Sequence, residues 1–264
     1  MQSDWVKQKY DTPLFNDILW NKPVNKQFMG KLLIMGGNLH KITAPSQAFM
    51  LANKYGAGQM QVLMPSSTKK LIPKPAPPEI VFLPSTPSGS FAKEAEQDAM
   101  HYVSWADCTL FVGNFSHNSE TGVLLENLSK TTTLQCFVED GIDYFVDNPL
   151  PIVNRNNTLL VVTMAQLQRL VKSLKLPTAV SLSMVSSQLV EILQTITSKY
   201  PIAIIVYHKQ NIFVSYIGQV SSTLLPSEPT HWRLANATSA SIWYMQQPNE
   251  PFKALTTAIT QISY

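Results

Sequence analysis

Three groups of polar residues in the first half of the chain have side chains suited to holding a polar or phosphorylated ligand. Each group follows a short apolar run, and together they supply two histidines, one lysine and three carboxylates, with Glu139 and Asp143 among the latter. The ligand-binding candidates that we select from them are Gly37, Asn38, His40, Lys41, Thr43, Asn114, His117 and Asp140. The simpler interpretation is that these loops are polar because they face water.

The apolar runs before these groups predict strands of a parallel sheet. Most are apolar throughout, as in strands that are covered on both faces, and helix-periodic segments lie between them. Because parallel strands end at one edge of a sheet, the three polar groups are expected to converge on one crevice there. The predicted strands are Lys31–Met35, Met60–Met64, Glu79–Leu83, Thr109–Val112, Leu134–Val138, Leu159–Thr163 and Ala203–Tyr207.

The intervening segments predict amphipathic helices, so the fold class is α/β with a doubly wound, mostly parallel sheet and helices on both faces. Thr43 is expected to cap one helix, with Pro45 in its first turn, and Gly56 to end it. Residues 212–224 predict a small antiparallel hairpin, and the proline-rich segment Ile72–Pro87 predicts a rigid surface excursion. We expect one domain over residues 1–264. The stripes that predict further helices are Leu167, Leu170, Val171 and Leu174; Val185, Leu189, Ile192, Leu193 and Ile196; and Leu255, Ala258, Ile259 and Ile262.

Composition excludes several classes of function. The net charge is only +3, and the one basic cluster (Lys69, Lys70 and Lys74) lacks interleaved aromatic residues, so no nucleic-acid partner is expected. No apolar run approaches membrane-spanning length, and the N-terminus lacks the apolar core of a signal peptide. Cys108 and Cys136 are expected to be buried free thiols, which favours a cytoplasmic protein. No membrane partner is expected.

The remaining histidines predict no metal site. His208 and His231 lack metal-ligand spacing to a cysteine or to a second histidine, so zinc is not expected. Trp232 and Trp243 are interpreted in two ways: they fill space that a ligand would occupy, or they belong to the core or an oligomer contact.

The first quarter of the chain carries a more specific pattern. Gly30-Lys31 leads into an apolar strand, Gly36-Gly37, Thr43, Pro45 and a helix that ends in Tyr55-Gly56-Ala57-Gly58. This order resembles the opening of the ADP- or ATP-dependent NAD(P)H-hydrate dehydratases, a branch of the ribokinase-like superfamily. Later matches are isolated but keep the family's order: Ala106-Asp107 before Gly113, the turn Phe137–Ile142, Thr163, and Pro251–Leu255.

The resemblance implies a metabolite-repair lyase with a ribokinase-like fold. Such an enzyme uses ATP or ADP with Mg²⁺ to phosphorylate the hydroxyl of hydrated NADH or NADPH, and loss of the phosphate restores the dihydronicotinamide. The family takes the hydroxyl proton with an aspartate and holds the phosphoryl group on a glycine-rich helix start, both in one glycine–threonine–glycine–aspartate turn. Family members are often homo-oligomers, which makes a homo-oligomer an expectation here.

This chain departs from the family in that turn. The corresponding stretch is Leu234–Ser241, where Asn236, Thr238 and Ser239 are the remnant of a phosphate loop and Ala240 falls near the aspartate's place. No aspartate follows Asp147, so no shift of the alignment supplies one, and the catalytic residue stays unknown. Replacing glycine also restricts φ and disfavours a tight anion-binding turn.

Other family motifs are altered as well. Asn114-Phe115 replaces a proline–glycine pair, and Met164 and Ala165 replace a proline and a histidine, while Gln166 or Gln168 stands for a glutamate. The sequence therefore favours a pseudoenzyme of this family that retains binding of a nucleotide or an NAD(P)-type ligand, or that supports a partner protein.

The alternative is an active dehydratase or related small-molecule kinase with replacement residues. In that hypothesis Glu228, His231 or Asp140 is the base, and Lys209 or Arg233 compensates phosphate charge.

Overall fold

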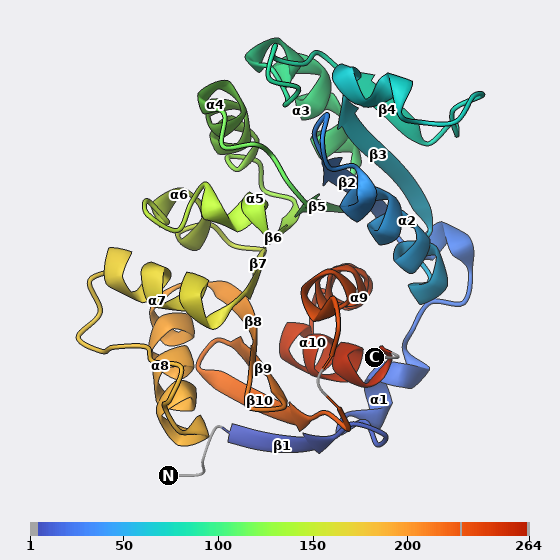
Figure 1. Ribbon diagram of the computed structural model, residues 1–264. Coiled ribbons are helices and arrows are strands. Elements are labelled where there is room, and N and C mark those ends of the chain that lie inside the picture. The colour runs from blue at the N-terminus through green and yellow to red at the C-terminus, as the bar shows by residue number, and fades with distance from the viewer. Residues whose placement is uncertain (1–4, 228, 263–264) are drawn as a thin grey trace.

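A single ten-stranded sheet organises the protein, which the computed structural model describes over residues 5–227 and 229–262. All its strands run parallel except β9, which pairs antiparallel with β8 and β10. Figure 1 shows the sheet curving around α9 and α10. The strands are β1 (Trp5–Lys9), β2 (Lys31–Gly36), β3 (Gln59–Pro65), β4 (Ile80–Leu83), β5 (Cys108–Val112), β6 (Leu134–Val138), β7 (Thr158–Val162), β8 (Ile202–His208), β9 (Asn211–Tyr216) and β10 (Gln219–Leu224).

The strand order β1-β10-β9-β8-β7-β6-β5-β2-β3-β4 places a topological switch point between β5 and β2. From β2 the chain proceeds outward through β3 to β4, crosses back to β5, and then proceeds the other way to β8. Ligands of open α/β sheets bind at the carboxyl ends of the strands beside such a point. The polar loops after β2 and β5 therefore lie where the topology favours a site.

Helices cover both faces of the sheet. One face packs against α1 (Asn16–Trp20), α2 (Thr43–Tyr55), α9 (Trp232–Gln246) and α10 (Pro251–Thr260). The other packs against α3 (Glu96–Trp105), α4 (Ser119–Leu128), α5 (Asp140–Asp143), α6 (Leu150–Val153), α7 (Met164–Ser173) and α8 (Ser186–Lys199). Short 3₁₀ turns complete the chain: η1 (Lys26–Phe28), η2 (Ser66–Lys70) and η3 (Lys93–Ala95).

The predicted fold class is confirmed, with local corrections. Thr43 is the first residue of α2 and not its cap, because Ile42 precedes the helix and no side chain caps it. Gly56 ends that helix at φ 87°, as predicted. Val185 precedes α8 and is exposed, so it is not part of the buried stripe. Thr163 lies beyond β7 and caps α7.

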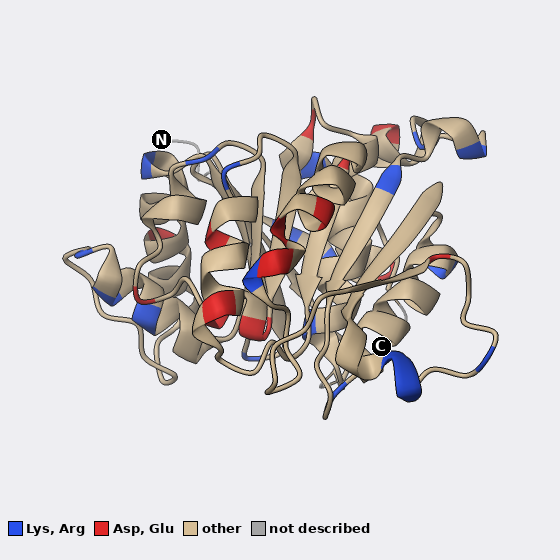
Figure 2. Cartoon of the chain, turned by 90° about the horizontal axis from the view of Figure 1, so that it is seen from above, with Lys and Arg blue, Asp and Glu red and all other residues tan. Residues whose placement is uncertain are grey.

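The sequence did not predict β1, which pairs parallel with β10 and covers the outer edge of the 212–224 hairpin. Figure 2 shows the charged residues as isolated segments on a ribbon that is otherwise uncharged. None of the helices within the described residues is long and apolar enough to cross a membrane.

Candidate functional site

The loops after β2 and β5 are locked together at the switch point. Asn38 is 1% exposed, and its amide nitrogen donates to the backbone oxygen of Asn114 at 3.2 Å and also to the side-chain oxygen of Asn114. The Asn38 side-chain oxygen accepts from the backbone amides of His40 at 2.8 Å and Lys41 at 3.1 Å. Asn38 thus holds the loop that presents His40 and Lys41 to solvent.

Glycine at the strand ends permits this close approach. A Cβ on Gly36 would lie 1.7 Å from the carbonyl oxygen of Val112, and a Cβ on Gly113 would lie 2.9 Å from the Cβ of Ala44. These glycines are therefore explained by contact between protein segments. They do not need a ligand to account for them.

The end of β6 adds a strained residue. Glu139 has φ 57° and ψ −129°, a conformation that is nearly confined to glycine. Next to it, the Asp140 carboxylate accepts from the backbone amide of Phe115 at 3.1 Å and ties β6 to the β5 loop. The Tyr144 hydroxyl accepts from the amide of Asn118 at 2.7 Å, and burial raises the pKa of Tyr144 to about 12.

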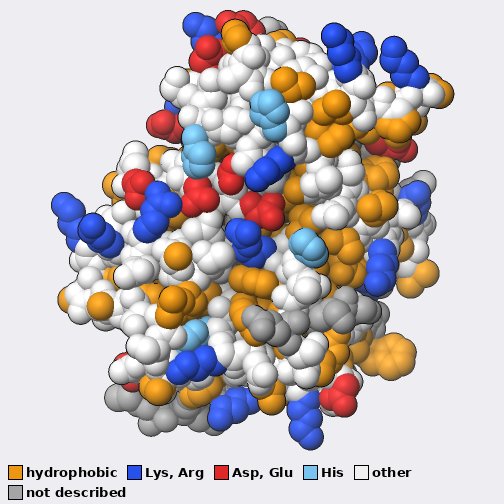
Figure 3. All heavy atoms as spheres, viewed as in Figure 1, with side chains coloured by type: hydrophobic (Ala, Val, Ile, Leu, Met, Phe, Trp, Pro, Cys, Tyr) orange, Lys and Arg blue, Asp and Glu red, His pale blue; other side chains and the backbone are white. Residues whose placement is uncertain are grey.

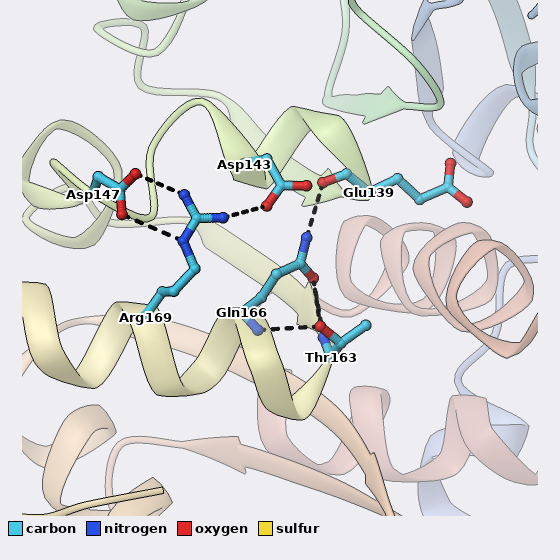
Figure 4. A network of polar contacts seen from close by, with 6 residues as sticks. All are labelled: Glu139, Asp143, Asp147, Thr163, Gln166 and Arg169. Atoms are coloured by element: carbon cyan, nitrogen blue, oxygen red, sulfur yellow. Dashed lines mark hydrogen bonds and ion pairs between the residues drawn. The ribbon is translucent and has the colours of Figure 1, made fainter. Parts of the chain in front are cut away.

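Figure 4 shows how α7 holds this turn from below. Thr163 and Gln166 form a reciprocal capping box at the start of α7, and the Gln166 amide donates to the backbone oxygen of Glu139 at 3.2 Å. The Glu139 carboxylate points away from this network. Within residues 5–227 and 229–262, no group donates a hydrogen bond to that carboxylate.

Arg169 on α7 neutralises the neighbouring acids. Its guanidinium bonds Asp143 at 3.1 Å and Asp147 at 2.6 Å, and this pairing lowers the pKa of Asp147. Asp140 and Asp143 are thus both engaged, whereas the Glu139 carboxylate has no hydrogen-bond or ion-pair partner among the described residues.

The first turn of α9 faces the same region but lacks the expected chemistry. The helix begins at Trp232 after His231, which adopts a left-handed conformation at φ 53°. Its first turn contains no acidic residue, and Glu228 lies outside the described residues. The Trp232 ring packs against Tyr207 at a centroid distance of 5.7 Å.

The residues that the sequence analysis aligned with a phosphate loop lie inside α9. Asn236, Thr238 and Ser239 are fully buried, more than one turn beyond the helix start. The Thr238 hydroxyl donates to the carbonyl of Leu234 at 2.8 Å, and the Ser239 hydroxyl donates to that of Ala258 at 3.2 Å. In this structure these three side chains present no polar group to solvent, and Ala240 is buried beside them.

The other residues that the sequence singled out separate into two places. His40, Lys41, Thr43 and His117 are exposed at the carboxyl edge, whereas Gly37 is buried with Asn38. Figure 3 shows acidic side chains gathered near the centre of this face, with basic and histidine side chains around them. Trp243 lies away from this face, buried in the core near Lys22, so it does not fill space at the carboxyl edge.

Lys209, a predicted phosphate ligand, lies in the β8–β9 turn, where its ammonium donates to the carbonyl of Ser183 at 3.2 Å. The sequence analysis placed Glu139 in a polar loop but did not select it. Its distinguishing signal is the backbone conformation, which no local sequence pattern reveals. Arg169 was likewise missed, because its acidic partners come from a different segment.

Comparison with solved structures identifies the fold. A ribokinase-like superfamily protein from Enterococcus faecalis matches with a TM-score of 0.70 at 14% identity, covering 98% of this chain and 86% of its own. The chain has the ribokinase-like fold. No protein-family model and no curated protein sequence matches it.

Two further neighbours were solved with nucleotides. The ADP/ATP-dependent NAD(P)H-hydrate dehydratase of Bacillus subtilis, co-crystallised with ATP/Mg²⁺, matches with a TM-score of 0.60 at 11% identity, over 89% of this chain and 79% of its own. Pyridoxal kinase of Staphylococcus aureus, in complex with AMP-PCP and pyridoxal, matches with a TM-score of 0.55 at 11% identity, over 85% and 83%. At these identities the similarity shows the fold alone.

Proposed function

We propose that the carboxyl edge of the sheet at the switch point binds an adenine nucleotide or an NAD(P)-type dinucleotide, and that the protein is a catalytically impaired relative of the NAD(P)H-hydrate dehydratases. The observation that carries the proposal is the first turn of α9. It has neither an acidic residue nor a glycine among its described residues, whereas the polar loops after β2 and β5 are retained.

The residues at this edge of the sheet fit a phosphorylated ligand. The α9 helix starts at the surface, where its first amides and the Arg233 guanidinium can meet phosphate oxygens, and Lys41 and His40 are exposed on the opposite loop. Mg²⁺ binds proteins through one or two carboxylates together with substrate phosphates. Glu139 is the carboxylate available for that role.

Impaired transfer follows from the same geometry. A hydroxyl that attacks a phosphoryl group needs a base within hydrogen-bond reach, and misplacing such a group by about 1 Å costs about 100-fold in rate. The Asp140 carboxylate is already used by the Phe115 amide, and Asp143 is paired with Arg169. Trp232 also brings a large ring to the start of α9.

Thermal-shift titration with Mg-ATP, Mg-ADP, NADH and NADPH tests the binding. A ligand at about 100 times its dissociation constant adds about 2.7 kcal/mol, which for a chain of this size raises Tm by roughly 5–10 °C. Lys41→Ala should reduce the shift, while the matched control Lys130→Ala, at the opposite edge of the sheet, should not. No shift with any of the four ligands would refute the proposal.

A second candidate function, active phosphoryl transfer, is favoured by one observation. Glu139 combines backbone strain, which clusters at functional sites, with a carboxylate that accepts no hydrogen bond from the part of the chain that the structure describes. If Glu139 is the base, the wild type releases phosphate from ATP in the presence of hydrated NADPH, and Glu139→Gln abolishes that release without weakening nucleotide binding. If the wild type releases no phosphate, active phosphoryl transfer is refuted and the catalytically impaired, ligand-binding protein remains the proposed function.

A further inference from the structure

An apolar pocket lies beside α2. It has a volume of about 300 Å³ and is formed between α2, β3 and the proline-rich segment, with Phe49, Met50, Met64, Ile72, Pro75 and Ile80 among its lining residues. Ser46 contributes the one polar side chain of the lining. Since an apolar cavity of about 150 Å³ accommodates benzene, this pocket has room for an indole ring.

Exposed apolar side chains lie near the other end of α2. Trp20 is 87% exposed, Val24 92% and Phe28 72%, all within one short segment. This segment is fixed to the C-terminal end of α2, because the Lys22 ammonium donates to the carbonyl of Tyr55 at 3.1 Å. Hydrophobic side chains gather along this flank of the molecule in Figure 3.

One helix therefore has an apolar pocket beside its N-terminal half and the exposed aromatic side chains of Trp20 and Phe28 beside its C-terminal end. When two copies pack α2 against α2 in antiparallel orientation, a two-fold axis places Trp20 of each copy at the pocket of the other. A two-fold interface requires this kind of self-complementary arrangement. We propose that the protein forms a symmetric dimer through α2, with Trp20 of each copy inserted into the apolar pocket of its partner.

Charge and area agree with this occupant. The outward residues of α2 include Ser46, Gln47, Met50 and Asn53, with Lys54 as the charged member, and the cores of interfaces are depleted of charge. Trp20 and Phe28 would together remove on the order of 300 Å² of surface from each copy. This is a large part of the roughly 800 Å² that each partner contributes to a stable interface.

Sedimentation equilibrium of the full chain tests the proposal. The wild type should be a dimer, and Trp20→Ser or the pocket-filling variant Ser46→Trp should raise the dimer dissociation constant by about tenfold or more. The control Leu182→Ser removes another exposed apolar side chain, 75% exposed and outside this surface, and should leave the dimer intact. An unchanged far-UV circular dichroism spectrum of each variant shows that the fold is preserved.

Cross-linking tests the geometry. A mixture of Asn21→Cys and Ser46→Cys chains should form an interchain disulfide, and neither variant should do so alone. The native Cys108 and Cys136 are buried and do not interfere. A monomeric wild type at every concentration, or a dimer unaffected by both Trp20→Ser and Ser46→Trp, would overturn the proposal.

Discussion

Glu139 provides a direct test of the argument from strain, because its backbone conformation favours glycine whereas the proposed role of its side chain requires a carboxylate. At φ 57° and ψ −129° a side chain costs about 1–3 kcal/mol, whereas glycine adopts this conformation freely. Elsewhere glycine is less stable than alanine by roughly 0.5–1 kcal/mol. We therefore expect Glu139→Gly to be more stable than Glu139→Ala by about 1–2 kcal/mol, a reversal of the usual order.

Urea unfolding of the two variants measures this difference directly, since both lack the carboxylate and differ only in the cost of the backbone. Gln166→Ala removes the amide that holds the Glu139 carbonyl and should reduce the advantage of glycine. An alanine variant as stable as the glycine variant would refute the argument from strain.

The same variants separate strain from function. Under the proposed function, Glu139→Gly gains stability but loses the carboxylate that would meet Mg²⁺. We expect its affinity for Mg-nucleotide to fall by about tenfold, with little change for the nucleotide without Mg²⁺. Equal losses with and without the metal ion would contradict that role for Glu139.

Three further perturbations have defined outcomes. Asn38→Ala frees the loop that carries His40 and Lys41, so it should lower the free energy of unfolding in urea by about 2 kcal/mol and weaken ligand binding. The surface control Asn148→Ala should change neither quantity. Arg155 donates to the carbonyls of Thr131, Thr133 and Asn157 and to the Thr158 hydroxyl. Arg155→Ala should therefore lower the free energy of unfolding by about 3 kcal/mol, and Arg155→Lys should lower it less, as calorimetry would show. Arg169 lowers the pKa of Asp147 in the folded chain, so this pair stabilises the protein above the unfolded pKa of about 3.9 and loses its effect as pH falls through the folded value. Because both groups are exposed, Arg169→Gln should cost no more than about 1 kcal/mol at pH 7 and nothing measurable near pH 2, and an equal cost at both pH values would exclude the ion pair as its cause.

Local patterns in the sequence determine most of the fold. The buried strands β2, β5 and β6 are apolar throughout, and the stripe on α7 has the helical period, so each element follows from its own residues. The order of these elements then predicts the parallel sheet and its carboxyl edge. β1 was missed because its place is set by pairing with β10, which is distant in sequence.

The site, in contrast, depends on contacts between segments that are distant in sequence. Whether Asn38 faces a ligand or Asn114, and whether Asp143 is free or paired with Arg169, is decided by groups that come from other segments. The start of α9 is set by the packing of the helix on the sheet, and this placed Thr238 in the core. Sequence determined which polar residues reach the carboxyl edge, whereas tertiary contacts decided that Glu139 is the carboxylate left free there, since strain and pairing arise only when distant segments meet.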